Sequence, residues 1–251
     1  MFRLDGKIAL VSGASRGLGL SMASSLAKQG AHVVLNGRDA DVLKSRVCTL
    51  EAQELSVSAM PFDVTDSLGV KRAIEEIVRE HGHLDILIAN AGIQHRSPIS
   101  EFEEEDFRRV VDTNLTGVWI LAKEVSKFMA DSNTGRIVFT GSITAEIGRP
   151  TISAYIASKG AVHALARQLA VELGDKNITV NAIAPGYFAT EMNQALMADG
   201  DFNDWVCTRV PARRWGKVDE IGAAAVFLAS DEAAYVNGHV LTMDGGLSIS
   251  M

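Results

Sequence analysis

The chain has 251 residues, with 24 Lys and Arg against 31 Asp and Glu, so its formal net charge is −7. This acidic balance argues against nucleic acid or an anionic membrane surface as the main partner, because both attract basic faces. A hydrophobic content of 47% is too high for a disordered chain, and two cysteines are too few for a disulfide scaffold. The first residues carry no apolar signal-peptide core, and the longest apolar run is too short to span a membrane, so we expect a cytoplasmic protein.

Short apolar runs alternate with longer amphipathic stretches along the whole chain. The runs are continuous rather than alternating, which is typical of strands buried on both faces of a parallel sheet. We expect strands at 8–11, 32–35, 57–62, 84–89, 136–140, 179–184 and 239–243.

The intervening stretches have helical periodicity. Apolar residues at 111, 115, 118, 122, 125 and 129 step by four and three, which predicts one helix face, and 70, 74 and 77 do the same. Gly30 and Gly82 follow two such patterns, where a left-handed helix end is expected. The order predicts a single α/β domain over 1–251, a Rossmann-like doubly wound sheet of seven mostly parallel strands flanked by helices. Ligands of such sheets bind beyond the carboxyl ends of the strands.

A glycine-rich loop follows the first predicted strand. It reads Gly13-Ala14-Ser15-Arg16-Gly17-Leu18-Gly19 and leads into a predicted helix. Glycines let the backbone approach a pyrophosphate closely, and the helix N-terminus offers free N–H groups. The G-x-x-x-G-x-G spacing differs from the common G-x-G-x-x-G, and a plain glycine-rich turn is the alternative. Its place in the first strand-to-helix turn favours dinucleotide binding.

The end of the second predicted strand bears on the choice of dinucleotide. An NAD enzyme usually has a carboxylate there, whereas this chain has Asn36 and Gly37, followed by Arg38. Arg16 and Arg38 provide two guanidinium groups suited to a 2′-phosphate, so we predict NADP(H) over NAD(H). Two alternatives remain: Arg38 is a solvated residue at a helix start and Asp39 is an acid at the N-terminus of that helix, or Asp39 reaches the ribose.

Tyr155 and Lys159 are four residues apart in a predicted helix, hence neighbours on one face. A nearby ammonium favours the phenolate and lowers the pKa of a tyrosine, which makes it a usable base. The same spacing also occurs in ordinary surface helices. Ser142 follows the strand at 136–140, on the same edge of the sheet, where its hydroxyl can hold a reacting oxygen while Tyr155 exchanges a proton.

Taken together, these residues make the chain resemble the short-chain dehydrogenase/reductase family over essentially its whole length. The residues that carry the resemblance are Gly13, Gly17, Gly19, Asp63, Val64, Asn90, Ala91, Gly92, Asn114, Ser142, Tyr155, Lys159, Pro185, Gly186, Thr190, Asp244, Gly245 and Gly246. Ser12 and Ala89 stand where the family usually has threonine and asparagine.

The resemblance implies a role for each position. Tyr155 would be the proton donor or base, Ser142 would position the substrate oxygen, and Lys159 would also bind the nicotinamide ribose. Asn114 would interrupt its helix and hold a water beside Lys159. The residues implied to contact the cofactor are Gly13, Ser15, Arg16, Gly17, Leu18, Gly19, Arg38, Asp63, Val64, Asn90, Ala91, Gly92, Tyr155, Lys159, Pro185, Gly186 and Thr190.

Two segments are similar to the gluconate 5-dehydrogenase branch of that family, which interconverts gluconate and 5-keto-gluconate. They are 93–98 and 184–216, and Thr144 departs from the glutamine common in that branch. A sugar-acid carboxylate pairs with a guanidinium and its hydroxyls need polar side chains. The substrate residues expected on this basis are Gln94, Arg96, Ser142, Thr144, Arg149 and Tyr187. Alternatively, Arg96 bridges to Glu101 or Glu103 and Arg149 is simply exposed.

Two other functions compete with this interpretation. One is a 3-oxoacyl-acyl-carrier-protein reductase or general carbonyl reductase, although the acidic net charge gives no support for an acidic carrier protein. The other is a non-catalytic dinucleotide sensor, which typically has lost part of the catalytic set. The dispersed histidines predict no metal site. The family resemblance implies a homotetramer, and 188–215 is expected to form a mobile substrate lid.

Overall fold

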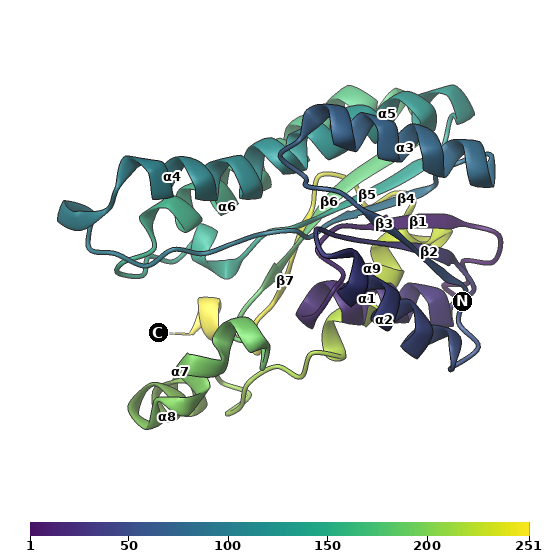
Figure 1. The fold of residues 1–251 in the computed structure, drawn as a ribbon. Coiled ribbons are helices and arrows are strands. Elements are labelled where there is room, and N and C mark those ends of the chain that lie inside the picture. Colours follow the sequence, from purple (N-terminus) through teal and green to yellow (C-terminus); the bar gives the residue numbers. More distant parts are fainter. Residues whose placement is uncertain (251) are drawn as a thin grey trace.

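A seven-stranded parallel sheet runs through the middle of the molecule, which is described here by a computed structural model covering residues 1–250 (Figure 1). The strand order is β3-β2-β1-β4-β5-β6-β7, and every neighbouring pair is parallel. The strands are β1 (Ile8–Val11), β2 (His32–Gly37), β3 (Val57–Pro61), β4 (Ile86–Ala89), β5 (Gly135–Thr140), β6 (Ile178–Pro185) and β7 (Val240–Met243). The predicted fold class is confirmed, with each expected strand present and its ends shifted by at most two residues.

Helices cover both faces of this sheet (Figure 1). One face carries α1 (Gly17–Lys28), α2 (Ala40–Glu51) and α9 (Glu220–Ala229); the other carries α3 (Ser67–His81), α5 (Gly117–Ser132) and α6 (Ser153–Leu173). The short helices α4 (Glu104–Val111), α7 (Gln194–Ala198) and α8 (Gly200–Arg209) lie beyond the sheet. No helix within residues 1–250 combines the length and apolarity needed to cross a bilayer.

The continuous apolar runs are explained by two hydrophobic cores, one on each side of the sheet. In β1, Ala9 and Val11 pack into the core beneath α1 and α9, while Ile8 and Leu10 pack into the core beneath α3 and α5. Successive strand residues point to opposite faces, so both sets must be apolar.

The periodic stretch at 111–129 is not one uninterrupted helix. A π-helical turn, Asp112–Thr116, separates α4 from α5, and Asn114 lies buried within it. The predicted apolar face is confirmed in α5, where Val118, Val125 and Met129 are buried. A helical pattern in sequence cannot show a π turn, because one extra residue per turn changes the register only locally.

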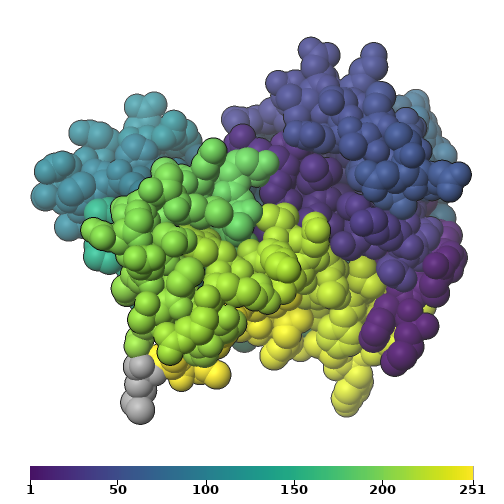
Figure 2. All heavy atoms as spheres, turned by 90° about the horizontal axis from the view of Figure 1, so that it is seen from below, coloured from purple at the N-terminus to yellow at the C-terminus, as the bar shows by residue number. Residues whose placement is uncertain are grey.

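β1 lies between β2 and β4, so the chain direction across the sheet reverses there. The carboxyl ends of β1 and β4 therefore flank a crevice into which the following loops project. The segment 188–215, which contains α7 and α8, lies on the underside of the molecule beside the C-terminal residues and appears in green in Figure 2.

Candidate active site

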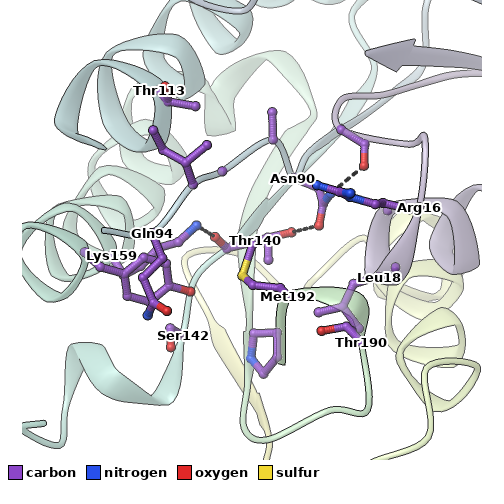
Figure 3. A pocket seen from close by; sticks show the side chains of 18 of the residues that line it. Arg16, Leu18, Asn90, Gln94, Thr113, Thr140, Ser142, Lys159, Thr190 and Met192 are labelled. Atoms are coloured by element: carbon purple, nitrogen blue, oxygen red, sulfur yellow. Dashed lines mark hydrogen bonds between the residues drawn. The ribbon is translucent and has the colours of Figure 1, made fainter. Parts of the chain in front are cut away.

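A cavity of about 470 Å³ opens at the carboxyl edge of the sheet, within the size range of small-molecule sites. Its walls come from the loops that follow β1 to β6, together with the start of α6 (Figure 3). All sequence-predicted cofactor and substrate residues line this cavity. Among the predicted catalytic residues, Ser142, Tyr155 and Lys159 line it, whereas Asn114 lies behind the wall.

The glycines of the first loop are required by close backbone approach. A Cβ atom on Gly13 would lie 2.8 Å from the Cα of Ala91, and one on Gly19 would lie 2.2 Å from the carbonyl oxygen of Gly13. Gly17 has φ = +56°, a left-handed conformation that favours glycine. The loop thus presents bare backbone and the N-terminus of α1 to the cavity, which fits the pyrophosphate of a dinucleotide.

Asn90 joins three strand ends at the crevice. Its Nδ2 donates to the carbonyl oxygens of Ser12 and Gly13, at 3.2 Å each, and its Oδ1 accepts from Thr140 Oγ1 at 3.2 Å. Figure 3 shows Asn90 and Thr140 facing each other across the cavity floor. Asn90 therefore fixes the phosphate loop relative to β5, so its role here is to hold the site together.

The end of β2 carries cationic groups and no cavity-facing carboxylate. Arg16 and Arg38 are exposed at the cavity, and neither forms an ion pair within residues 1–250. The buried Asn36 amide donates to the carbonyl oxygens of Met60 and Phe62, both at 3.1 Å, so it faces β3. The two guanidinium groups remain available for a phosphate.

Asp39 has a structural role in this region. Its carboxylate accepts hydrogen bonds from the backbone N–H groups of Asp41 and Val42, both at 3.0 Å, and so caps the N-terminus of α2. A cap of this kind stabilises a helix by about 1 kcal/mol. Both bonds end on Oδ1, so the cap occupies one of the two carboxylate oxygens of Asp39.

Lys159 is held at the base of the cavity by the end of β5. Its Nζ donates to the carbonyl oxygen of Thr140 at 2.6 Å (Figure 3). The same Nζ lies 5.7 Å from the centre of the Tyr155 ring. Burial lowers the pKa of Lys159 to about 8, so the ammonium keeps its proton at neutral pH. The predicted neighbourhood of Tyr155 and Lys159 on one face of α6 is present.

The electrostatics of Tyr155 differ from the sequence-based expectation. Burial raises the pKa of this phenol, while the adjacent Ser142 hydroxyl and the Arg96 guanidinium act to lower it. The expectation that Lys159 lowers this pKa is not seen; the cation that acts on the phenol is Arg96. In the free protein Tyr155 therefore holds its proton at neutral pH, the state of a proton donor.

Ser142 lies opposite Tyr155 on the loop after β5. Its Oγ is 2.9 Å from the Thr144 Oγ1 and accepts from the Thr144 N–H at 3.2 Å. Thr144 therefore orients the Ser142 hydroxyl in the free protein.

Asn114 supports the cavity from behind. Its Oδ1 accepts from the Ile93 N–H at 2.8 Å, and its Nδ2 donates to the Ile93 carbonyl oxygen at 2.9 Å and to Ser158 Oγ at 3.2 Å. The side chain thus holds the loop after β4 against α6. The predicted interruption of its helix is present as the π turn.

Two predicted substrate arginines have different surroundings. Arg149 Nη1 donates to the Tyr187 hydroxyl at 2.7 Å, and its guanidinium lies 4.4 Å from the centre of the Phe202 ring. Arg149 is therefore bound to the segment 188–215 rather than simply exposed. The ion pairs within residues 1–250 do not include Arg96 with Glu101 or Glu103. Burial and the charge of Arg149 lower the pKa of Arg96, while Tyr187 and Tyr155 act to raise it.

Tyr187 links the cavity to an aromatic cluster in the segment 188–215. Tyr187, which follows β6, contacts Phe202, Trp205 and Trp215 with ring centres 5.5, 5.9 and 5.6 Å apart. The Trp215 Nε1 donates to Asn203 Oδ1 at 2.9 Å. Both tryptophans pack against side chains of this cluster.

Sequence reasoning missed some cavity residues. Thr140 is the clearest, because its carbonyl oxygen holds Lys159 and its hydroxyl holds Asn90. Its position as the last residue of a predicted central strand was the available signal. Met192 and Asn193 also line the cavity, and no pattern in the sequence marked them. The part of the chain that the structure describes contains no grouping of three or more His, Cys, Asp or Glu suited to a metal ion.

Comparisons with known proteins agree with this geometry. A family model described as enoyl-(acyl carrier protein) reductase matches residues 13–248. Gluconate 5-dehydrogenase of Gluconobacter oxydans is 46% identical over 251 residues, covering 100% of this chain and 98% of the relative. The 5-keto-D-gluconate 5-reductase of Escherichia coli K12 is 41% identical, covering 100% and 99%.

A solved structure is equally close. The gluconate 5-dehydrogenase of Burkholderia cenocepacia J2315, crystallised in complex with NADP and tartrate, has a TM-score of 0.97 and 41% identity, covering 100% of this chain and 98% of that one. Since sequence and fold match relatives over their full length, this chain belongs to the short-chain dehydrogenase/reductase family.

Proposed function

We propose that this protein is an NADP(H)-dependent oxidoreductase that interconverts a sugar acid and its keto acid, with gluconate and 5-keto-gluconate as the substrate pair. The observation that carries this proposal is the Arg96 guanidinium, which lines the same cavity as the Tyr155 phenol and has no carboxylate partner within residues 1–250. A ketone that bears a carboxylate satisfies both groups at once. The names of the relatives at 41–46% identity support the same substrate pair.

The residues present fit a dinucleotide. Gly13, Gly17 and Gly19 form a cradle that a Cβ atom would fill, and Arg16 and Arg38 supply charge for a 2′-phosphate. The remaining residues proposed to hold the cofactor are Ser15, Leu18, Asp63, Val64, Asn90, Ala91, Gly92, Tyr155, Lys159, Pro185, Gly186 and Thr190. When bound, the nicotinamide supplies or accepts the hydride.

The protein's own residues manage the oxygen and its proton. Ser142 Oγ and the Tyr155 hydroxyl hold the substrate oxygen between them. In reduction Tyr155 donates its proton to that oxygen, and in oxidation the phenolate collects it. The Arg96 guanidinium favours the phenolate, and Lys159, held by the Thr140 carbonyl oxygen, binds the nicotinamide ribose. Asn114 keeps the loop after β4 in place beside α6.

The substrate chain extends from the reacting carbon toward Arg96. We propose that Arg96 binds the carboxylate as a charge-assisted pair and that Gln94, Thr144 and Tyr187 bind hydroxyl groups. Arg149 acts on the substrate through Tyr187, whose hydroxyl it fixes at 2.7 Å.

We also propose that residues 188–215 of the single domain form a lid and that the enzyme is a cytoplasmic homotetramer. Exposed Phe107 on α4 and Trp119 on α5 support an interface on that face. Light scattering of the purified protein gives the mass directly: a tetramer is expected, and a monomer would contradict the proposal.

The substrate class is tested with a matched pair of ketoses. L-sorbose has a hydroxymethyl group where 5-keto-gluconate has its carboxylate. Initial rates of NADPH oxidation are expected to favour 5-keto-gluconate by about tenfold or more in kcat/KM, because a charged hydrogen bond contributes about 1.5–3 kcal/mol. Equal kcat/KM values for the two ketoses would show that the enzyme does not recognise the carboxylate.

A further inference from the structure

His163 is a buried titratable residue to which the proposed mechanism gives no role. It lies on α6 four residues after Lys159 and eight after Tyr155, so the three side chains follow one face of the helix. Its side chain is almost fully enclosed, with 4% exposure. A buried imidazole loses hydration and is retained only where its nitrogen has a partner.

That partner is the backbone of the loop that carries Ser142. The Ser142 N–H donates to His163 Nε2 at 3.4 Å, inside the protein. The preceding residue must be glycine, because a Cβ atom on Gly141 would lie 2.2 Å from the same Nε2. The imidazole is therefore seated directly against the Gly141–Ser142 backbone.

The same helix also holds the other side of this turn. Lys159 Nζ donates to the Thr140 carbonyl oxygen at 2.6 Å, just before Gly141. Lys159 and His163, one turn apart on α6, thus bond to the backbone on either side of Gly141. Lys159 donates to the carbonyl group before it, and His163 accepts from the N–H group after it. This pair sets where the loop begins and therefore where the Ser142 hydroxyl lies relative to Tyr155.

We propose that His163 is a positioning residue, whose neutral imidazole accepts the Ser142 N–H through Nε2 and so holds Ser142 for proton transfer. This inference rests on the proposed function of Ser142 and Tyr155. The hydrogen bond requires a free lone pair on Nε2, so the neutral ring carries its proton on Nδ1. A protonated ring has two donors and would face the Ser142 N–H with no acceptor.

The charged groups around the imidazole influence the pH at which His163 takes up a proton. Burial lowers the pKa of His163 below its ordinary value near 6.5; Glu146, after β5, acts to raise it, and Arg167 and Lys159, both on α6, act to lower it further. The ring is therefore neutral at neutral pH. It loses its acceptor only in mildly acidic solution, where a fall in kcat is expected.

Two substitutions separate positioning from packing. H163Q places an amide oxygen where Nε2 lies, whereas H163L fills the space without an acceptor. Losing one net hydrogen bond corresponds to about tenfold, so kcat of H163L is expected to fall about tenfold while the KM for NADPH is unchanged. H163Q is expected to retain kcat within about twofold at pH 7.5 and to lack the acidic fall of the wild type.

The exposed Arg167 provides a matched control on the same helix. R167Q removes a charge that lowers the pKa of His163, so the acidic fall is expected to move to higher pH with kcat at pH 7.5 unchanged. Equal kcat for H163Q and H163L, or an acidic fall that persists in H163Q, would overturn the proposal. If H163L does not fold, the pH profile of H163Q decides alone.

A measurement without substrate keeps this test separate from the proposed function. In wild-type protein labelled with ¹⁵N-histidine and ¹⁵N-serine, NMR is expected to show Nε2 unprotonated and the Ser142 amide shifting with the same midpoint as His163. Independent titration of the two signals, or a proton on Nε2 at pH 7.5, would overturn the positioning role. Lack of turnover of 5-keto-gluconate by the wild type would instead refute the proposed function.

Discussion

Arg38→Gln is the sharpest perturbation of cofactor choice. Arg38 is exposed at the end of β2 and forms no ion pair within residues 1–250, so its loss breaks no internal ion pair, although its charge acts to lower the pKa of Asp63. Stability is expected to change by less than about 0.5 kcal/mol, as for other surface sites. The guanidinium is solvated, so its bond to a 2′-phosphate belongs at the lower end of the range for charged hydrogen bonds, about 1.5 kcal/mol.

That energy corresponds to an increase of about tenfold in the KM for NADPH, because 1.4 kcal/mol is a factor of ten. The KM for NADH and kcat are expected to stay unchanged, since NADH has no 2′-phosphate and Arg38 lies far from the reacting oxygen. Initial rates with 5-keto-gluconate at varied cofactor measure all three. Arg79→Gln, an exposed arginine on α3, removes the same charge away from the cavity and controls for long-range effects. An equal rise in both KM values, or no rise for NADPH, would refute the 2′-phosphate assignment.

Four further predictions concern the chemistry, the substrate, the lid and stability. Tyr155→Phe is expected to lower kcat by about 10³-fold or more, while NADPH still binds as measured by fluorescence. Retained turnover would show that Tyr155 is not the proton donor. Arg96→Gln should raise the KM for 5-keto-gluconate about tenfold but leave the KM for NADPH unchanged. Limited proteolysis should first cut within 188–215, and more slowly with NADP and substrate; identical cutting rates would contradict the lid. Burial lowers the pKa of His32, so the unfolded chain binds its proton first as pH falls below about 6.5, and stability declines. In urea unfolding, the free energy of unfolding should fall less between pH 7 and pH 5 in His32→Gln than in the wild type. An equal fall in both proteins would mean that groups other than His32 cause it.

The local chemistry of the chain was sufficient to predict the sheet and the phosphate loop. The inner strands β1, β2, β4, β5 and β6 are buried on both faces, which leaves largely apolar runs that need no knowledge of distant contacts. The glycines at 13 and 19 are forced by backbone atoms of the same crevice, so their spacing appears directly in the sequence. The π turn was not predictable from periodicity, because the helical pattern continues on both sides of it.

The substrate side of the cavity depends on contacts that no spacing encodes. Arg149 meets Phe202, which lies more than fifty residues later, through the packing of α8 beneath the loop after β5. The pKa of Tyr155 depends on Arg96 from the loop after β4, whereas the helical spacing pointed to Lys159. Short-range patterns thus identify the residues, and the three-dimensional packing decides which charge acts on which group.

The central claim is NADP(H)-dependent chemistry on a keto sugar acid, and one initial-rate experiment tests it most directly. The purified protein is given 5-keto-gluconate with NADPH, with NADH, and, in place of the sugar acid, an acetoacetyl thioester with NADPH. We predict fast oxidation of NADPH with 5-keto-gluconate, and slow rates both with NADH and with the thioester. Fast turnover of the thioester with little turnover of 5-keto-gluconate would contradict the account and place the enzyme among reductases of acyl thioesters.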